Sequence, residues 1–172
     1  YTDQLLDRIL TMPLKVAVII LLCIPVQPLL AITYVEGTVS GSWNTMGSPY
    51  YVVGDLLVPF GQSLQIDPGV DVYFQGHYCM EVRGRLTAVG NPSNHIVFSA
   101  NPSIGWKGIR MILPDNNSEI SYCEFEHGNA YSIQDRLEGY GGAIFLKFAD
   151  VPITHNTFKF NAAQNGGAIA NW

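Results

Sequence analysis

A short segment between two tyrosines holds the residues best suited to contact a ligand. Asp135, Arg136 and Glu138 lie between Tyr131 and Tyr140, so both charge signs and aromatic rings occur together. Loops on a rigid scaffold often carry binding residues, and a tyrosine ring can stack on a sugar. We interpret this segment as a candidate ligand-binding loop. The alternative is an ordinary solvated corner loop.

The histidines do not form a metal-binding pattern. His77, His95, His127 and His155 have no second histidine two or four residues away, the spacing at which two rings can share a zinc ion. We therefore expect no metal and no cofactor, and we expect the histidines to pack against other aromatic rings.

Charge and composition restrict the class of protein. The 172 residues carry a net charge of −5 with nine Lys and Arg, too few for the basic stripe of a nucleic-acid-binding surface. The length suggests at most one domain. Seventeen glycines and ten prolines indicate a chain rich in turns and strands.

Residues 12–31 have the layout of a secretory signal peptide. Lys15 supplies a positive start, 16–26 is apolar, and the small residue Ala31 is the expected cleavage point. A membrane anchor needs about 20 apolar residues, whereas Pro25 and Pro28 interrupt this run. A lipoprotein signal around Cys23 is the other alternative. We interpret 1–11 as a non-native upstream extension and predict a secreted or outer-surface mature chain, 32–172, with no membrane span.

The mature chain keeps two cysteines, Cys79 and Cys123. An oxidising compartment would allow them to form a disulfide, and the alternative is two buried, unpaired thiols. The sequence leaves both possibilities open.

Internal repeats predict the architecture. Gly141-Gly142-Ala143-Ile144 recurs as Gly166-Gly167-Ala168-Ile169 after 25 residues, and 120–125 resembles 153–158 after 33 residues. The difference of 33 − 25 = 8 residues predicts an insertion of that length within 131–140. A third, weaker similarity relates residues 52–56 to residues 82–86, 30 residues later. Periods of this size are typical of solenoids and propellers.

Short strands between turns make a parallel β-helix the best fit to these repeats. Apolar alternation predicts strands at 64–66, 70–72, 80–82 and 96–98, and no helical periodicity spans ten residues. Under the 33-residue offset, Phe125 should stack on Phe158 and Glu126 should meet Lys159. The same offset places Cys123 beside Asn156, Tyr122 beside His155 and His127 beside Phe160. Trp43, Trp106 and Trp172 are expected to be core or capping residues.

The sequence also resembles a known fold class. The residues that carry this resemblance are Gly41-Ser42-Trp43, Ser48-Pro49-Tyr50, Gly54-Asp55, Ile66-Asp67-Pro68-Gly69-Val70, Ala88-Val89-Gly90 and Trp106-Lys107-Gly108-Ile109. They resemble the first coils of large secreted bacterial proteins of the right-handed parallel β-helix (pectin-lyase-like) class. Phe158, Asn161 and the following Gly166–Ile169 resemble the paired FxxN and GGAI repeats of polymorphic outer-membrane proteins, which are surface adhesins. The earlier coil has Gly128 where this motif has Asn.

The resemblance implies a structural, adhesive or glycan-contacting role outside the cell. The partners to expect are extracellular glycans or the surface of a host or neighbouring cell. The NxD, DD, GHG and RxK motifs of galacturonan hydrolases and the RxPxxR pattern of pectate lyases do not occur in the sequence, so we predict no catalytic residue here.

Because no capping segment follows Trp172, we expect the β-helix to be truncated at its C-terminal end. The alternative function is the N-terminal part of a polysaccharide lyase or glycoside hydrolase whose active coils lie downstream.

Overall fold

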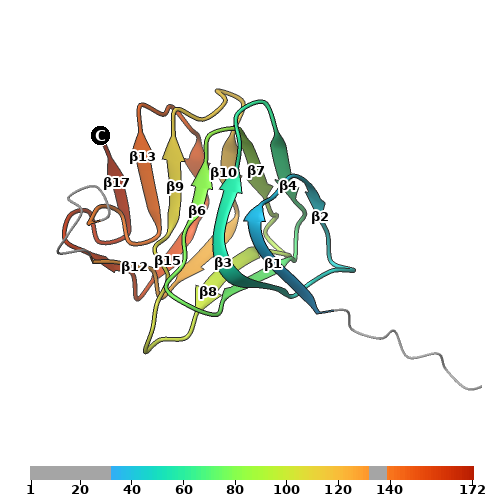
Figure 1. The fold of residues 1–172 in the computed structure, drawn as a ribbon, viewed down its shortest axis with the longest axis horizontal. Helices are drawn as coiled ribbons and strands as arrows, with labels where there is room; N and C mark the ends of the chain where they lie inside the picture. Colours follow the sequence, from blue (N-terminus) through green and yellow to red (C-terminus); the bar gives the residue numbers. More distant parts are fainter. Residues whose placement is uncertain (1–31, 132–138) are drawn as a thin grey trace, which may run out of the picture.

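In the computed structural model, every regular element of the described residues, 32–131 and 139–172, is a β-strand (Figure 1). The predicted extension 1–11, the signal segment 12–31 with its cleavage site Ala31, and the loop residues Asp135, Arg136 and Glu138 lie outside the described residues. The strands are short and alternate between buried and exposed side chains, as the sequence pattern predicts.

One row of strands forms a separate five-stranded parallel sheet, which we call the first ladder. Its order is β14-β10-β7-β4-β2, and the strands are β2 (Gly41–Trp43), β4 (Ser63–Ile66), β7 (Arg85–Val89), β10 (Glu119–Ser121) and β14 (Ile153–Thr154).

The larger sheet consists of two further rows joined by the long strand β3 (Tyr50–Val58). The N-terminal half of β3 begins the second ladder, which continues through β5 (Asp71–Phe74), β8 (Ile96–Ala100), β11 (Cys123–Glu126) and β15 (Thr157–Lys159). The C-terminal half begins the third ladder, which continues through β6 (Met80–Val82), β9 (Ile109–Ile112), β13 (Ile144–Lys147) and β17 (Ile169–Asn171). Strand β1 (Thr33–Thr38) pairs with both halves of β3.

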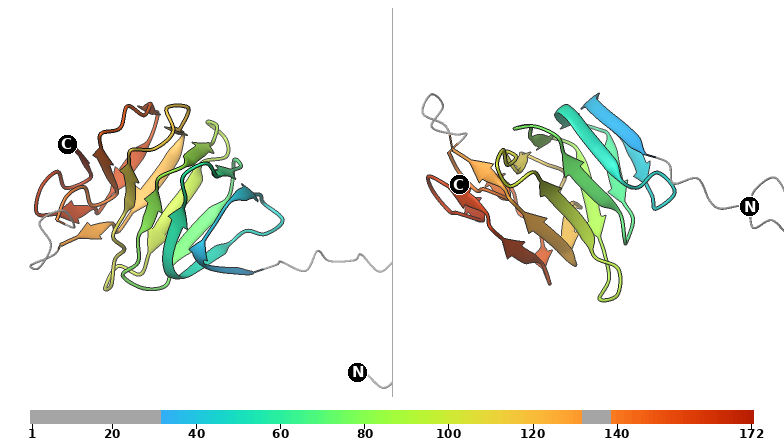
Figure 2. Two further views of the ribbon diagram at one scale, coloured as in Figure 1. Left: turned by 45° about the horizontal axis from the view of Figure 1, so that its top comes forward. Right: turned by 90° about the horizontal axis from the view of Figure 1, so that it is seen from below.

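Each pass of the chain adds one strand to each ladder in turn. Figure 2 shows the resulting curled sheet, with neighbouring passes side by side. A small parallel pair, β12 (Asn129–Ala130) and β16 (Ala162–Ala163), lies between the second and third ladders in the last two passes. The prediction of an all-β fold with parallel strands is confirmed.

The predicted stacking offsets are confirmed for the last two passes. Ile120 pairs with Ile153 and Asn129 with Ala162 at the 33-residue offset, whereas Ile144 pairs with Ile169 at the 25-residue offset. The change occurs between Ala130 and Tyr140, where the insertion was expected. The 30-residue similarity is not a stacking register, because β3 pairs with β6 through Val58 and Val82 instead of Val52 and Val82.

The core is built from inward side chains that stack from pass to pass. Phe98, Phe125 and Phe158 form one column, with ring centroids 5.0 and 5.1 Å apart and nearly parallel planes. The fully buried Trp106 stacks on Phe74 with centroids 4.3 Å apart. Trp43 is buried too, so the expectation of a core role is confirmed for Trp43 and Trp106. Trp172 is 60% exposed and is not a core residue.

Bulky residues occupy left-handed backbone conformations where the chain turns between ladders. Tyr122 and His155 have φ values of 50° and 56°, and their rings stack with centroids 4.6 Å apart. His127 and Phe160 repeat this arrangement at the next turn, with φ values of 59° and 55° and centroids 5.4 Å apart. The predicted pairs are therefore confirmed, and the side-chain stacking offsets part of the backbone strain.

Two asparagines hold these turns together across passes. The Cys123 N–H donates to Asn156 Oδ1 at 2.7 Å, and Asn156 Nδ2 donates to the Ile120 carbonyl at 3.0 Å. Asn161 makes the equivalent pair of bonds, accepting from the Gly128 N–H at 2.8 Å and donating to the Phe125 carbonyl at 2.9 Å. Each asparagine thus satisfies the backbone groups on both sides of a left-handed residue in the preceding pass.

Three of the four glycines of the repeat, Gly141, Gly142 and Gly166, lie where a Cβ would clash with backbone atoms. Gly141 and Gly166 have φ values of 59° and 62°, and a Cβ on Gly142 would lie 2.3 Å from the Gly167 carbonyl oxygen. Gly128 stands where the repeat has asparagine, and a Cβ at this position would lie 2.1 Å from the Gly142 carbonyl oxygen. The first glycine of each pair therefore marks a left-handed corner, and Gly142 marks a close approach between passes.

Replacing Phe125 should be among the most destabilising changes in the protein. Phe125→Ala opens a cavity between two stacked rings and should cost about 3–5 kcal/mol of unfolding free energy, whereas Phe125→Leu should cost about 1 kcal/mol. Urea unfolding followed by tryptophan fluorescence measures both. Equal losses for the two variants would contradict the stacked column.

Asn161→Ala should lower the unfolding free energy by about 2 kcal/mol, because it leaves the Gly128 N–H and the Phe125 carbonyl without their partner. Asn116→Ala, at an exposed turn, is the matched control and should change it by less than about 0.5 kcal/mol. The same urea titration gives the comparison, and similar midpoints for the two variants would show that the two bonds contribute little.

Candidate functional site

The two tyrosines of the predicted binding loop have different surroundings. Tyr131 is 61% exposed and follows β12. Tyr140 is half-buried, stacks on Trp172 with ring centroids 6.4 Å apart and lies 5.7 Å from Phe145. Tyr140 therefore anchors the C-terminal end of the loop, while Tyr131 is free to contact a ligand. The charged members of the loop are not among the described residues.

A second set of tyrosines, not singled out from the sequence, lies on the outer face of the second ladder. Tyr34 pairs in register with Tyr51, and Tyr51 with Tyr73, so one tyrosine comes from each of β1, β3 and β5. Their ring centroids are 5.7 and 6.0 Å apart, with the planes tilted. We call these three residues the tyrosine row. It belongs to the first passes, whereas Tyr131 and Tyr140 belong to a later one.

A groove of about 350 Å³ runs beside the tyrosine row. It combines two tyrosine rings with polar groups that can donate and accept hydrogen bonds. The lining residues are Tyr51, Tyr73, Phe74, Gln75, Ser99, Ala100, Asn101 and Ile104. Ile104 is 46% exposed, so the groove has an accessible apolar wall as well as polar ones.

Carboxylates surround the last member of the tyrosine row. Burial raises the pKa of Asp71, which lies two residues before Tyr73 on β5. Burial also raises the pKa of Tyr73, with further contributions from Asp71, Tyr51 and Glu126. The contributions of Asp71 and Glu126 to the raised pKa of Tyr73 mean that additional negative charge at Tyr73 is unfavourable.

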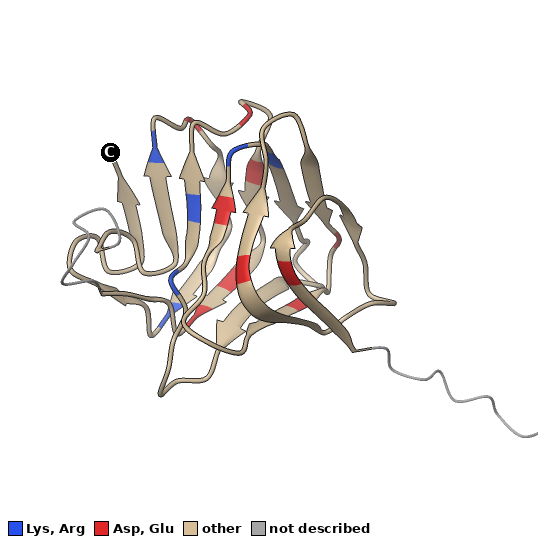
Figure 3. Cartoon of the chain, viewed as in Figure 1, with Lys and Arg blue, Asp and Glu red and all other residues tan. Residues whose placement is uncertain are grey.

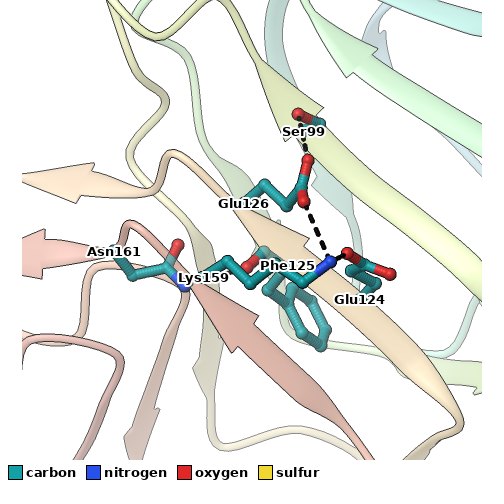
Figure 4. Close-up of polar contacts among 6 residues, drawn as sticks. All are labelled: Ser99, Glu124, Phe125, Glu126, Lys159 and Asn161. Carbon is teal, nitrogen blue, oxygen red and sulfur yellow. Dashed lines mark hydrogen bonds and ion pairs between the residues drawn. The ribbon is translucent and has the colours of Figure 1, made fainter.

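Beyond the tyrosine row, the outer-face positions of the next strands in the second ladder are polar or charged. Tyr73 pairs with Ser99 on β8, and the Ser99 hydroxyl donates to Glu126 Oε2 on β11 at 3.5 Å. Lys159 on β15 lies 3.4 Å from Glu126 and also pairs with Glu124 (Figure 4). The predicted contact of Glu126 with Lys159 is confirmed. Because Lys159 is shared between two carboxylates and exposed, the ion pairs contribute at most about 1 kcal/mol to stability.

A smaller groove of about 120 Å³ lies at the turns between the third and first ladders, next to the exposed ring of Phe60. Its two arginines already have partners: Arg83 pairs with Glu81, and Arg85 Nε donates to the Asn117 carbonyl at 3.1 Å. Hydrogen bonds from Asn117 hold the pKa of Asp115 below its usual value. The Arg85 bond joins two turns, and Glu81 balances the charge of Arg83.

The two described thiols are free and poorly suited to nucleophilic chemistry. Burial, followed by the nearby Asp55 carboxylate, raises the pKa of Cys79 to about 11. Burial raises the pKa of Cys123 to about 12, and its Sγ lies 3.4 Å from the carbonyls of Ala88 and Ser121. Cys123 thus acts as a small packing residue.

The described residues contain neither a metal-binding cluster nor a membrane-spanning helix. No three His, Cys, Asp or Glu side chains in 32–131 and 139–172 lie close enough together to hold a metal ion. Within the same residues, no helix is long and apolar enough to cross a membrane.

No family model, curated protein or solved structure matches the chain. The geometry of the described residues therefore carries the functional argument.

Sequence reasoning missed the tyrosine row because its members are not evenly spaced. Tyr34 and Tyr51 are 17 residues apart, and Tyr51 and Tyr73 are 22 apart. The available signal was the alternation within the strands, which places Tyr51 and Tyr73 on the face opposite Val52 and Val72.

Both thiols should react slowly in the folded protein. At about pH 8 a thiol of pKa about 11 is roughly one part in a thousand thiolate, so iodoacetamide should modify Cys79 slowly and Cys123 more slowly still. Unfolding in urea should bring both to the same, much faster rate. Mass spectrometry of the separate peptides gives the time courses, and equally rapid labelling of Cys123 in the folded protein would contradict its burial.

Proposed function

We propose that the protein is an extracellular binding scaffold that holds an extended glycan along the tyrosine row. The observation that carries the proposal is the row itself: three tyrosines from three successive strands, Tyr34, Tyr51 and Tyr73, beside a groove with polar walls. Aromatic rings next to hydrogen-bonding groups suit the apolar faces and hydroxyls of sugars. The signal-like segment 12–31 supports a place of action outside the cell.

The proposed scaffold is a right-handed parallel β-helix. Three parallel ladders, visited in the same order by each pass, support this assignment. Right-handedness follows from the general rule that crossovers between parallel strands are right-handed. In such a scaffold, equivalent outer positions recur about every 4.8 Å, so a ligand lying across the strands meets a new side chain at each pass.

An adhesive role fits the row better than cleavage of the glycan. A glycoside hydrolase needs two carboxylates with separate acid and base roles. Glu124 and Glu126 are instead both held by Lys159, and Asp71 lies on a strand two away from theirs. Binding without turnover is the function these side chains support best.

Tyr51→Ala and Tyr73→Ala should each weaken oligosaccharide binding about tenfold, because each removes one stacking ring. Isothermal titration with oligosaccharides of increasing length measures the affinity, which should rise with length until the row is filled. Tyr122→Ala, which removes a tyrosine from the turn after β10 and not from the row, is the control and should leave the affinity unchanged.

Tyr131→Ala separates the tyrosine row from the loop predicted from the sequence. Loss of binding in this variant alone would place the site at the loop and overturn the proposal. Release of shorter oligosaccharides, followed by mass spectrometry during the titration, would favour the enzyme alternative instead of adhesion.

A further inference from the structure

Negative charge is concentrated in the part of the chain that carries the tyrosine row. Residues 32–82 contain five carboxylates, Glu36, Asp55, Asp67, Asp71 and Glu81, and no Lys or Arg, which gives a charge of −5. Residues 83–172 contain seven of each sign and are neutral. Glu36 and Asp71 lie on strands β1 and β5 of the row, whereas Asp55 and Glu81 lie where β3 and β6 pair in the third ladder, and Glu81 is paired with Arg83. Figure 3 shows the acidic segments of β1, β3 and β6 in red.

The carboxylates lie on the same strands as the rings. Glu36 shares β1 with Tyr34, and Asp71 shares β5 with Tyr73. Asp71 is two residues from Tyr73 within a regular strand, the spacing that places both side chains on one face. The pairing of β1 shifts between Val35 and Gly37, and the exposed Glu36 lies against Gly54 of β3. Glu124 is in register with Asp71 through Val97, two strand spacings or about 10 Å away. Asp71 therefore lies beside Tyr73 on the same strand, and Glu126 lies beyond Ser99, which is in register with Tyr73.

The positive charges do not reach this part of the face. Lys159 is the one Lys or Arg that the described strands of the second ladder carry, and it is engaged by Glu124 and Glu126 on the far side of Ser99. Asp71 is half-buried, and burial, without a contribution from a nearby cation, raises its pKa. A positively charged group on a ligand would pair with the Asp71 carboxylate and compensate its charge.

We infer that the tyrosine row selects a glycan carrying free amino groups, such as a polymer of glucosamine, over neutral or acidic glycans. The rings would hold the sugar faces, and Glu36 and Asp71 would pair with ammonium groups along the chain. Polyuronates would be repelled by the same carboxylates. This inference rests on the proposed function, because it specifies the ligand of that same surface.

Three hexasaccharides of matched length test the inference: β-1,4-linked glucosamine, its fully N-acetylated form, and galacturonic acid. At a pH where the amines are protonated, the glucosamine hexamer should bind the protein about tenfold more tightly than the acetylated one. High salt should reduce this difference by screening the charges. Galacturonate should bind most weakly.

Two carboxamide variants assign the effect to the row. Asp71→Asn should weaken binding of the glucosamine hexamer about fivefold and leave the acetylated hexamer unchanged. Asp150→Asn removes the same charge from an exposed position in the neutral part of the chain, so it should change neither affinity.

The outcomes distinguish this inference from the proposed function. If all glycans fail to bind, the proposed function itself is wrong. Equal affinity for the glucosamine and acetylated hexamers, or preference for galacturonate, would overturn the inference alone. Binding of the glucosamine hexamer that survives Tyr51→Ala with Tyr73→Ala, or equally tight binding of a lysine hexapeptide, would mean that charge alone attracts the ligand, and would also overturn it.

Discussion

The structure depends on each pass of the chain lying in register on the pass before it. Inward side chains stack directly on their counterparts, as Phe125 does on Phe98 and Phe158, so a slip of one residue would turn an aromatic column outward. Parallel pairing within all three ladders follows from this requirement. The core is therefore a set of columns of inward side chains that run across the strands.

The turns between ladders satisfy the same requirement by a different means. Tyr122 and His127 take left-handed conformations that are unfavourable for bulky residues. Asn156 and Asn161 then bond the backbone on both sides of these residues from the following pass. The strained turn of one pass is thus held by the next. This explains why Phe158 and Asn161 occur together in the repeat: one fills a column and the other fixes a turn.

A regular interior leaves the outer face free to vary. The positions in register with Tyr34, Tyr51 and Tyr73 become Ser99, Glu126 and Lys159 in later passes, so one outer row changes from aromatic to charged without altering the core. Asp71 lies beside the aromatic part of the row, where burial raises its pKa. A surface that is aromatic and acidic over several strands is what the proposed ligand class requires.

The sequence by itself determined the strand class, the 33- and 25-residue registers, the insertion between them and the glycine corners. These are local or repeated features, and similar residues at a fixed spacing occupy equivalent places. It did not reveal the tyrosine row, because the first passes differ in length and their pairing depends on which inward side chains fit together. For the same reason the 30-residue similarity does not give the pairing of the first passes: Val58, not Val52, lies beside Val82. Only the tertiary structure decided which tyrosines and carboxylates share a face, since that depends on how passes of unequal length pack on one core.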